Sequence, residues 1–335
     1  MSRRRAKTPW YTASRLAQER WKATTRSIPV DARRPGRTWV EDRGVRKLVG
    51  PFPVCLPLAH TAENLIVGVR AEAIERFARH GIEWHHASES PDGTPWPSGH
   101  LLDSQVQCVN TLLSLAAQPD RGLAFARSVE PQAQELVEVE DGSVVAFEWI
   151  GARDYLGERL GRPAMRGRFT TSIDAFLLAR RVDGGLTGIL VEWKFTESYD
   201  RPMRFRGPGG TDRREVYRAL YEAPGGPFRT RPPIEAYFHE PHYQLLRLVL
   251  LAQGMVTASE LGMDHAVVVH AVPGGNRTLL ETVPDGLSHL GSTVPEVWGE
   301  LVGGGNVAWR WLDTTPWIAA TPALAERYGG LTDPA

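Results

Sequence analysis

Cysteine is nearly absent from this chain, and the two that are present, Cys55 and Cys108, form no CxxC pair. A single possible pairing gives no disulfide framework, so we expect a protein of a reducing compartment. The sequence contains no GxSxG nucleophile elbow, and GPGG at 207–210 lacks the Gly-Lys-Ser/Thr that completes a phosphate-binding loop. These absences disfavour a disulfide-stabilised secreted domain, a hydrolase with that elbow, and nucleotide hydrolysis.

Long hydrophobic runs are missing as well. The best apolar candidate, residues 245–252, includes Arg247 and is far too short to span a bilayer. The charged start MSRRRAKTPW is followed by no apolar stretch, so it does not resemble a signal peptide. We therefore expect a soluble, cytoplasmic protein without a membrane partner.

The chain also lacks a net charge, because its 39 Lys and Arg balance its 39 Asp and Glu. The distribution is uneven, since residues 1–48 hold fourteen Lys and Arg but four Asp and Glu. A basic N-terminal arm over 1–48, on a mildly acidic body, indicates a polyanionic partner. A solvated, partly disordered tail explains the same composition equally well.

The remaining residues, 49–335, show mixed periodicity and no internal repeat. Helices are predicted at 14–25, 70–80, 103–117, 212–222, 241–253 and 294–301, and strands at 143–149, 170–182, 186–195, 266–271 and 307–312. This mixture predicts one α/β domain, with an insertion at 198–240.

The stretch GILVEWKFTE, residues 188–197, places Glu192 and Lys194 on one face of an otherwise apolar strand, where charge is costly. If residues 183–185 form a three-residue hairpin loop, counting outward places Asp174 opposite Lys194. Asp174 and Glu192 then become diagonal neighbours. A two-residue loop would turn Asp174 to the other face, so the cluster depends on this turn.

Two carboxylates this close repel each other unless a cation cancels their charge. Hard oxygen ligands on a rigid sheet suit Mg²⁺, which polarises a phosphoryl oxygen and lowers the pKa of bound water. A neighbouring lysine can orient that water or stabilise the charge that develops on the phosphate. The cluster therefore indicates metal-assisted phosphodiester hydrolysis. An exposed Glu–Lys–Asp cluster on a half-solvated sheet is the alternative, because ExK in a strand is a short, common pattern.

At this point the residues resemble a family. Asp174, a hairpin and then Glu192-Trp193-Lys194 are similar to the D…(D/E)xK signature of the PD-(D/E)xK, restriction-endonuclease-like nuclease superfamily. GILVEWKFTE resembles the IEVKYTE strand of a bacterial branch of that superfamily. Residues 103–110 resemble its SSQxxxxN helix, and residues 243–245 resemble a YQL stretch on its later helix. The resemblance covers roughly residues 95–275.

The resemblance implies a restriction-endonuclease-like core, with a central mixed β-sheet flanked by helices. It also implies that Asp174, Glu192 and the backbone carbonyl of Trp193 bind Mg²⁺, for which Mn²⁺ can substitute. Lys194 would position the nucleophile, and Gln244 would lie near the metal-bound water or the scissile phosphate.

The roles of two further residues, Gln105 and Glu148, are not decided by the resemblance. Gln105 stands where the superfamily often has an acidic residue on its first core helix, and Glu148 could supply an extra carboxylate instead. A surface glutamate at a strand end is an equally good interpretation of Glu148. Ile173, not proline, precedes Asp174, which is a common departure in the superfamily.

The insertion is rich in arginine with aromatic residues between, as expected of a segment that follows phosphates. The candidates for nucleic-acid contact, with Gln105, are Tyr199, Arg204, Arg206, Arg213 and Arg214. Several acids dilute this patch, so a solvated loop with internal ion pairs is the alternative.

Together these features predict a Mg²⁺-dependent endonuclease acting on nucleic acid, and the superfamily implies DNA. The alternatives are a catalytically inactive nucleic-acid-binding protein of the same fold and a structure-specific or RNA nuclease. Cutting both strands of a duplex usually calls for two active sites, and hence a homodimer, although the sequence shows no apolar stripe that would mark an interface.

Overall fold

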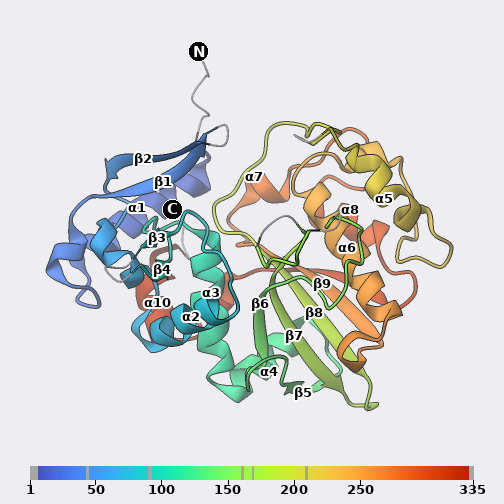
Figure 1. Cartoon of the computed structure of the whole chain (residues 1–335), viewed down its shortest axis with the longest axis horizontal. Helices are drawn as coiled ribbons and strands as arrows, with labels where there is room; N and C mark the ends of the chain where they lie inside the picture. The colour runs from blue at the N-terminus through green and yellow to red at the C-terminus, as the bar shows by residue number, and fades with distance from the viewer. Residues whose placement is uncertain are drawn as a thin grey trace.

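A mixed sheet lies at the centre of the computed structural model, which describes residues 7–42, 45–89, 93–159, 162–167, 170–207 and 210–331. In the described residues this sheet has six strands in the order β10-β9-β8-β7-β5, with β6 also paired to β7 (Figure 1). The strands are β5 (Ala133–Val137), β6 (Val145–Trp149), β7 (Ile173–Arg181), β8 (Leu186–Trp193), β9 (His265–Ala271) and β10 (Val307–Leu312).

The strands β5 to β8 pair antiparallel, whereas β8, β9 and β10 run parallel. Nearly every residue of β7 and β8 is buried, because helices cover both faces of the sheet. A strand that is buried on both sides has a continuous apolar sequence. The charged residues Glu192 and Lys194 are therefore conspicuous exceptions in this stretch. The predicted mixed sheet flanked by helices is confirmed.

Helices pack on both sides of this sheet (Figure 1). Their bounds are α1 (Pro9–Thr24), α2 (Val67–Arg79), α3 (Ser104–Ala116), α4 (Pro119–Val129), α5 (Arg213–Glu222), α6 (His242–Thr257), α7 (Arg277–Leu280), α8 (Val294–Leu301), α9 (Thr315–Ile318) and α10 (Pro322–Tyr328). The helix α3 packs on β6, β7 and β8, while α6 packs on β8, β9 and β10 from the opposite face. These two helices bring their first turns to the end of β8.

The N-terminal residues form a helix and a hairpin, and not a solvated tail, over the part of 7–48 that the structure describes. The strands β1 (Gly36–Asp42) and β2 (Val45–Phe52) pair antiparallel, and a small pair, β3 (Ser88–Glu89) and β4 (Pro95–Trp96), lies nearby. The helix α1 packs against α10, so the two ends of the described chain meet.

The hairpin between β7 and β8 differs from the expected register by two positions. Arg180 pairs with Leu186, and Arg181 donates its backbone N–H to the carbonyl of Gly185 over 2.8 Å. The three-residue loop is therefore 182–184, one residue earlier than predicted, with Gly184 at φ +88° in the position that favours glycine. A shift of two positions keeps every side chain on its predicted face.

Among the described residues, no helix is both long and apolar enough to cross a membrane.

Candidate active site

Three carboxylates stand in one row across three neighbouring strands. In β6 and β7 the pairs Phe147–Ala175 and Trp149–Ile173 enclose Glu148 and Asp174, which therefore lie opposite each other. In β7 and β8 the pair Ala175–Val191 is followed by Asp174 opposite Glu192. The prediction that Asp174 faces Lys194 is wrong because of the two-residue shift, and Asp174 faces Glu192 directly.

Glu148, Asp174 and Glu192 line a single cavity of about 190 Å³. The cavity wall also includes His85, Ser104, Gln105, Gly167, Thr170, Thr171, Ser172, Lys194, Gln244, Arg247 and Leu248. The structure thus brings together every acid, amine and amide that the sequence assigned to catalysis.

Backbone and side-chain hydrogen bonds hold the two acids of the D…ExK motif in place. Asp174 Oδ2 accepts the backbone N–H of Trp193 over 2.7 Å. Lys194 Nζ donates to Glu192 Oε1 over 2.5 Å, and both side chains are buried. The backbone N–H of Lys194 bonds the carbonyl of Ala271 over 2.8 Å, so the chain stays extended beside β9 beyond the end of β8.

Burial sets the electrostatics of this row. It raises the pKa of Asp174 well above its usual value, and the charge of Glu192 raises it further. It also raises the pKa of Glu148 to about 7, against the hydrogen bond from Gln105. Burial acts to lower the pKa of Lys194, but the carboxylate of Glu192 outweighs it and holds that pKa well above the usual value. The carboxyls of Asp174 and Glu148 are therefore costly to ionise here unless a cation offsets their charge.

Gln105 connects the first turn of α3 to the row of acids. Asp103 caps this helix by accepting the N–H of Val106 over 3.1 Å, which places Gln105 in the first turn. Gln105 Nε2 donates to Glu148 Oε1 over 2.8 Å, and its Oε1 accepts the N–H of His85 over 2.8 Å. Glu148 is buried and has φ +47°, a conformation that is strained for a residue other than glycine. It is therefore not a surface glutamate.

Two polar residues of α6 reach the cavity from the opposite layer. Gln244 lies in the first turn, and its Oε1 is buried without a hydrogen-bond partner among the described residues. Arg247 follows three positions later, on the same helix face. The sequence interpretation missed Arg247, although its i, i+3 spacing from Gln244 was a usable signal.

Arg247 is held in a fixed position. Its Nε donates to Thr171 Oγ1 over 2.8 Å and to Glu158 Oε1 over 3.2 Å. Burial acts to raise the pKa of Glu158, but Arg247, Tyr217 and Thr171 together lower it, so Glu158 is a carboxylate. Glu158 and Thr171 thus hold Arg247 through its Nε, and Arg247 forms part of the cavity wall.

His270 continues the row of acids on β9, where it pairs with Glu192. It is completely buried, and neither ring nitrogen has a hydrogen-bond partner in the described part of the chain. Burial, and then the charge of Lys194, hold its pKa well below the usual value, so the ring is neutral. Sequence analysis did not identify this residue.

The insertion contributes less to this cavity than the sequence suggested. Tyr199, Arg204, Arg206, Arg213 and Arg214 do not line it. Arg214 pairs with Asp212 over 2.7 Å, and Arg218 pairs with Glu235 over 3.2 Å, so the segment contains internal ion pairs. Tyr199 packs beside α7 instead.

The oxygen atoms around Asp174 and Glu192 are the ones that could hold a metal ion. No cluster of three or more His, Cys, Asp and Glu side chains in the described ranges is arranged to hold one. Two facing carboxylates with a neighbouring carbonyl are nevertheless a hard-oxygen set, and Mg²⁺ keeps several waters in such sites. Gln244 Oε1, which is buried without a partner among the described residues, is a further oxygen in the wall of the same cavity.

Comparison with known proteins identifies the family of this chain. A family model described as "Restriction Endonuclease associating with ARP" matches residues 15–299. This range includes the whole central sheet except β10 and every residue of the cavity. No curated protein and no solved structure matches the chain. The chain therefore belongs to the family of restriction endonucleases associating with ARP, a restriction-endonuclease-like family whose membership indicates a nuclease.

Proposed function

We propose that this chain is a Mg²⁺-dependent endonuclease that hydrolyses phosphodiester bonds in DNA. The observation that carries the proposal is the placement of Asp174 opposite Glu192, with Lys194 bonded to Glu192, in one cavity. A module that only bound nucleic acid would gain nothing from buried carboxylates that repel phosphate.

Asp174, Glu192 and the carbonyl of Trp193 would hold Mg²⁺, or Mn²⁺ in its place. The ion, when bound, supplies a Lewis acid that polarises a phosphoryl oxygen and makes water a stronger nucleophile. The hydrogen bond from the N–H of Trp193 orients Asp174 for this role.

The other residues of the cavity orient the reactants. The ammonium of Lys194 directs the attacking water and stabilises the charge that develops on the phosphoryl oxygens. Gln244 Oε1, which lacks a partner among the described residues, accepts a hydrogen bond from that water. Arg247 binds the scissile phosphate or its neighbour, since Glu158 and Thr171 fix its Nε and a guanidinium matches phosphate in shape and charge.

Plasmid cleavage tests the proposal. Wild-type protein should convert supercoiled DNA to nicked or linear forms with Mg²⁺ or Mn²⁺, and not with EDTA. Asp174→Asn and Lys194→Ala should each slow cleavage by about a hundredfold or more, because both act directly on the reacting groups. Asp285→Asn is the matched control, since it makes the same carboxylate-to-amide change at an exposed position and should cut as wild type does.

The alternatives give different results in the same assay. A wild-type protein that binds DNA and cuts none of the duplex, single-stranded, branched or RNA substrates would identify an inactive binding protein and contradict the proposal. Cleavage confined to RNA or to branched DNA would keep the hydrolytic site but overturn the assignment to duplex DNA.

A further inference from the structure

A second cavity, of about 740 Å³, lies next to the proposed active site along the chain. Glu148 lines the first cavity, and Trp149, the next residue, lines the second. The loop before β7 is also shared, because 164–166 border the second cavity while Gly167 and 170–172 border the first. We propose that this second cavity holds one nucleobase of the nucleic-acid substrate, unstacked from its neighbours, beside the scissile phosphate. The inference rests on the proposed function, since it names part of the substrate of that site.

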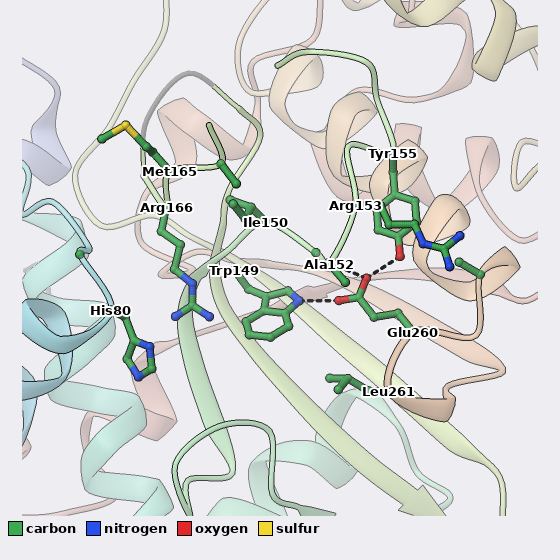
Figure 2. Close-up of a pocket in the computed structure, with 14 residues that line it drawn as sticks. His80, Trp149, Ile150, Ala152, Arg153, Tyr155, Met165, Arg166, Glu260 and Leu261 are labelled. Atoms are coloured by element: carbon green, nitrogen blue, oxygen red, sulfur yellow. Dashed lines mark hydrogen bonds between the residues drawn. The ribbon is translucent and has the colours of Figure 1, made fainter. Parts of the chain in front are cut away.

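An aromatic ring and a planar cation form one wall of the cavity (Figure 2). The indole of Trp149 stacks on Phe176, with ring centroids 5.7 Å apart and planes inclined by 15°. The guanidinium of Arg166 lies 4.7 Å from the centroid of the same indole. Guanidinium planes and aromatic rings are the groups on which proteins stack unpaired bases.

A buried carboxylate joins Trp149 to its neighbours in the cavity wall without presenting its charge to a ligand. Figure 2 shows Glu260 between Trp149 and Tyr155. Its oxygens accept Trp149 Nε1 over 3.0 Å, Tyr155 Oη over 2.7 Å and the N–H of Ala152 over 3.0 Å. Three donors satisfy this carboxylate, so its role is to fix two aromatic side chains before any ligand arrives.

The backbone around Glu260 is strained. Ser259 has φ +49° and Leu261 has φ +52°, a region that side chains other than glycine seldom adopt. Leu261 faces the cavity and is 41% exposed. Strain of this kind persists where the surrounding structure imposes it, and it clusters at binding sites.

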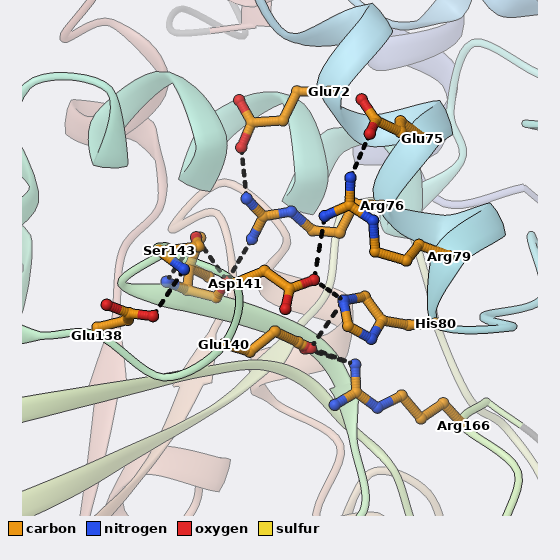
Figure 3. Close-up of polar contacts among 12 residues, drawn as sticks. Glu72, Glu75, Arg76, Arg79, His80, Glu138, Glu140, Asp141, Ser143 and Arg166 are labelled. Carbon is orange, nitrogen blue, oxygen red and sulfur yellow. Dashed lines mark hydrogen bonds and ion pairs between the residues drawn. The ribbon is translucent and has the colours of Figure 1, made fainter.

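A network that links the end of α2 to the turn before β6 fixes Arg166 (Figure 3). Its Nη1 donates to both oxygens of Glu140 over 2.7 Å. His80 lies 2.9 Å from Asp141 and 3.5 Å from Glu140, which ties the acids of the turn to α2. The cation that would stack on a base is therefore held in place.

The lining suits a base in size and chemistry. The volume falls in the range of small-molecule sites. Ile150, Met165 and Leu261 provide apolar surface for ring edges, and the exposed Arg153 lies beside Tyr155 at the same wall, where it can meet a flanking phosphate. An aromatic, apolar and cationic lining therefore matches a nucleobase together with its phosphate.

A mismatch scan tests the inference. Affinities are measured in EDTA for duplexes that carry one mismatched base pair, moved one position at a time across the oligonucleotide. A mismatch removes most of the cost of extruding a base, so at one position wild-type protein should bind about tenfold or more tightly than to the matched duplex. Ala152→Trp and Ala164→Trp fill the cavity from exposed loop positions and should abolish that preference. Trp311→Phe, on β10, is the control and should retain it.

The outcomes separate this inference from the proposed nuclease activity. A flat scan with wild-type protein that cuts DNA, or a preference that survives both filling variants, would overturn the base pocket alone. A clear preference with no cleavage in Mg²⁺ or Mn²⁺ would support the pocket and overturn the nuclease. A flat scan in which adenosine or cytidine monophosphate raises the melting temperature of wild type, and not of the filled variants, would assign the cavity to a free nucleotide and overturn the inference.

Discussion

The residues of the first cavity differ in how their buried charge is balanced. Arg247 pairs with Glu158 and Lys194 pairs with Glu192, and the cavity that these residues line also holds the buried acids Asp174 and Glu148. An unbalanced buried charge lowers stability, and the raised pKa of Asp174 expresses that cost. Proteins keep such arrangements where function requires them, which is why we read the imbalance as a binding site for a cation.

Arg247 gives a prediction at the same scale. Arg247→Ala should raise the KM for DNA by roughly tenfold or more, because it removes a charged hydrogen bond to phosphate. Arg247→Lys keeps the positive charge but loses the paired N–H donors of the guanidinium. Its KM should therefore lie between those of wild type and Arg247→Ala. Steady-state cleavage kinetics measure both. Arg277→Ala, at a position whose side chain is 80% exposed and lies outside the cavity, should behave as wild type.

A purely structural role for Arg247 would appear differently. Its loss would then lower the free energy of unfolding by leaving Glu158 unpaired, while the KM of the folded enzyme stayed at the wild-type value.

Some helices and strands could be predicted from local sequence patterns, and others could not. The helix α8 and the strand β10 have the predicted bounds, because breakers flank a clear hydrophobic period. The helix α4 was missed, although Pro119 at its first position is a usual helix start. The strand β5 is short and half exposed, so only its pairing with β7 defines it.

In the candidate site, residues of a local motif could be predicted, whereas residues that depend on contacts distant in sequence could not. The motif and the alternation of faces placed Asp174, Glu192 and Lys194 on one side of the sheet. The contact of Arg247 with Glu158 joins residues 89 positions apart, which no local pattern contains. The hairpin register depended on which glycine adopts positive φ, and two adjacent glycines, Gly184 and Gly185, left that choice open.

Arg181 gives a prediction for the hairpin. At the end of β7 it donates to Asp264 over 2.8 Å and to Thr187 over 3.0 Å, and so ties β7, β8 and the start of β9 together. Arg181→Ala should lower the free energy of unfolding by about 1–3 kcal/mol in urea titrations. Cleavage by the folded protein should not change, because Asp174 lies at the other end of β7.

Arg180→Ala is the matched control. Its pair with Glu135 is exposed, so its loss should cost less than about 1 kcal/mol. If Arg181→Ala abolished cleavage while leaving stability intact, the hairpin would not act as a rigid support for the site.

The two ends of the described chain pack together next to the strand that carries Glu192. Trp10 Nε1 donates to the carbonyl of Phe195 over 2.7 Å, directly after Lys194. Gln18 Nε2 donates to the carbonyl of Arg327 over 2.9 Å, and Arg327 Nη2 reaches Asn64 over 2.7 Å. The basic N-terminal segment is therefore part of the fold that supports the site, whatever it contributes to binding nucleic acid.

Trp10→Ala tests this connection. Removing a buried tryptophan should cost about 3–5 kcal/mol of unfolding free energy and also reduce cleavage, because Phe195 loses its anchor. Trp311→Ala, on β10 with 38% exposure, should cost much less and leave cleavage intact. Equal stability of the two variants, with weaker DNA binding by Trp10→Ala alone, would instead show that the segment acts as a detached arm.

Anomalous diffraction from crystals soaked in Mn²⁺ tests directly whether Asp174 and Glu192 bind a metal ion. We expect a peak bound by the carboxylates of Asp174 and Glu192, and its loss in crystals of Asp174→Asn grown and soaked in the same way. Crystals that diffract well but show no Mn²⁺ peak between these two side chains, with Lys194 still bonded to Glu192, would contradict a metal-dependent nuclease.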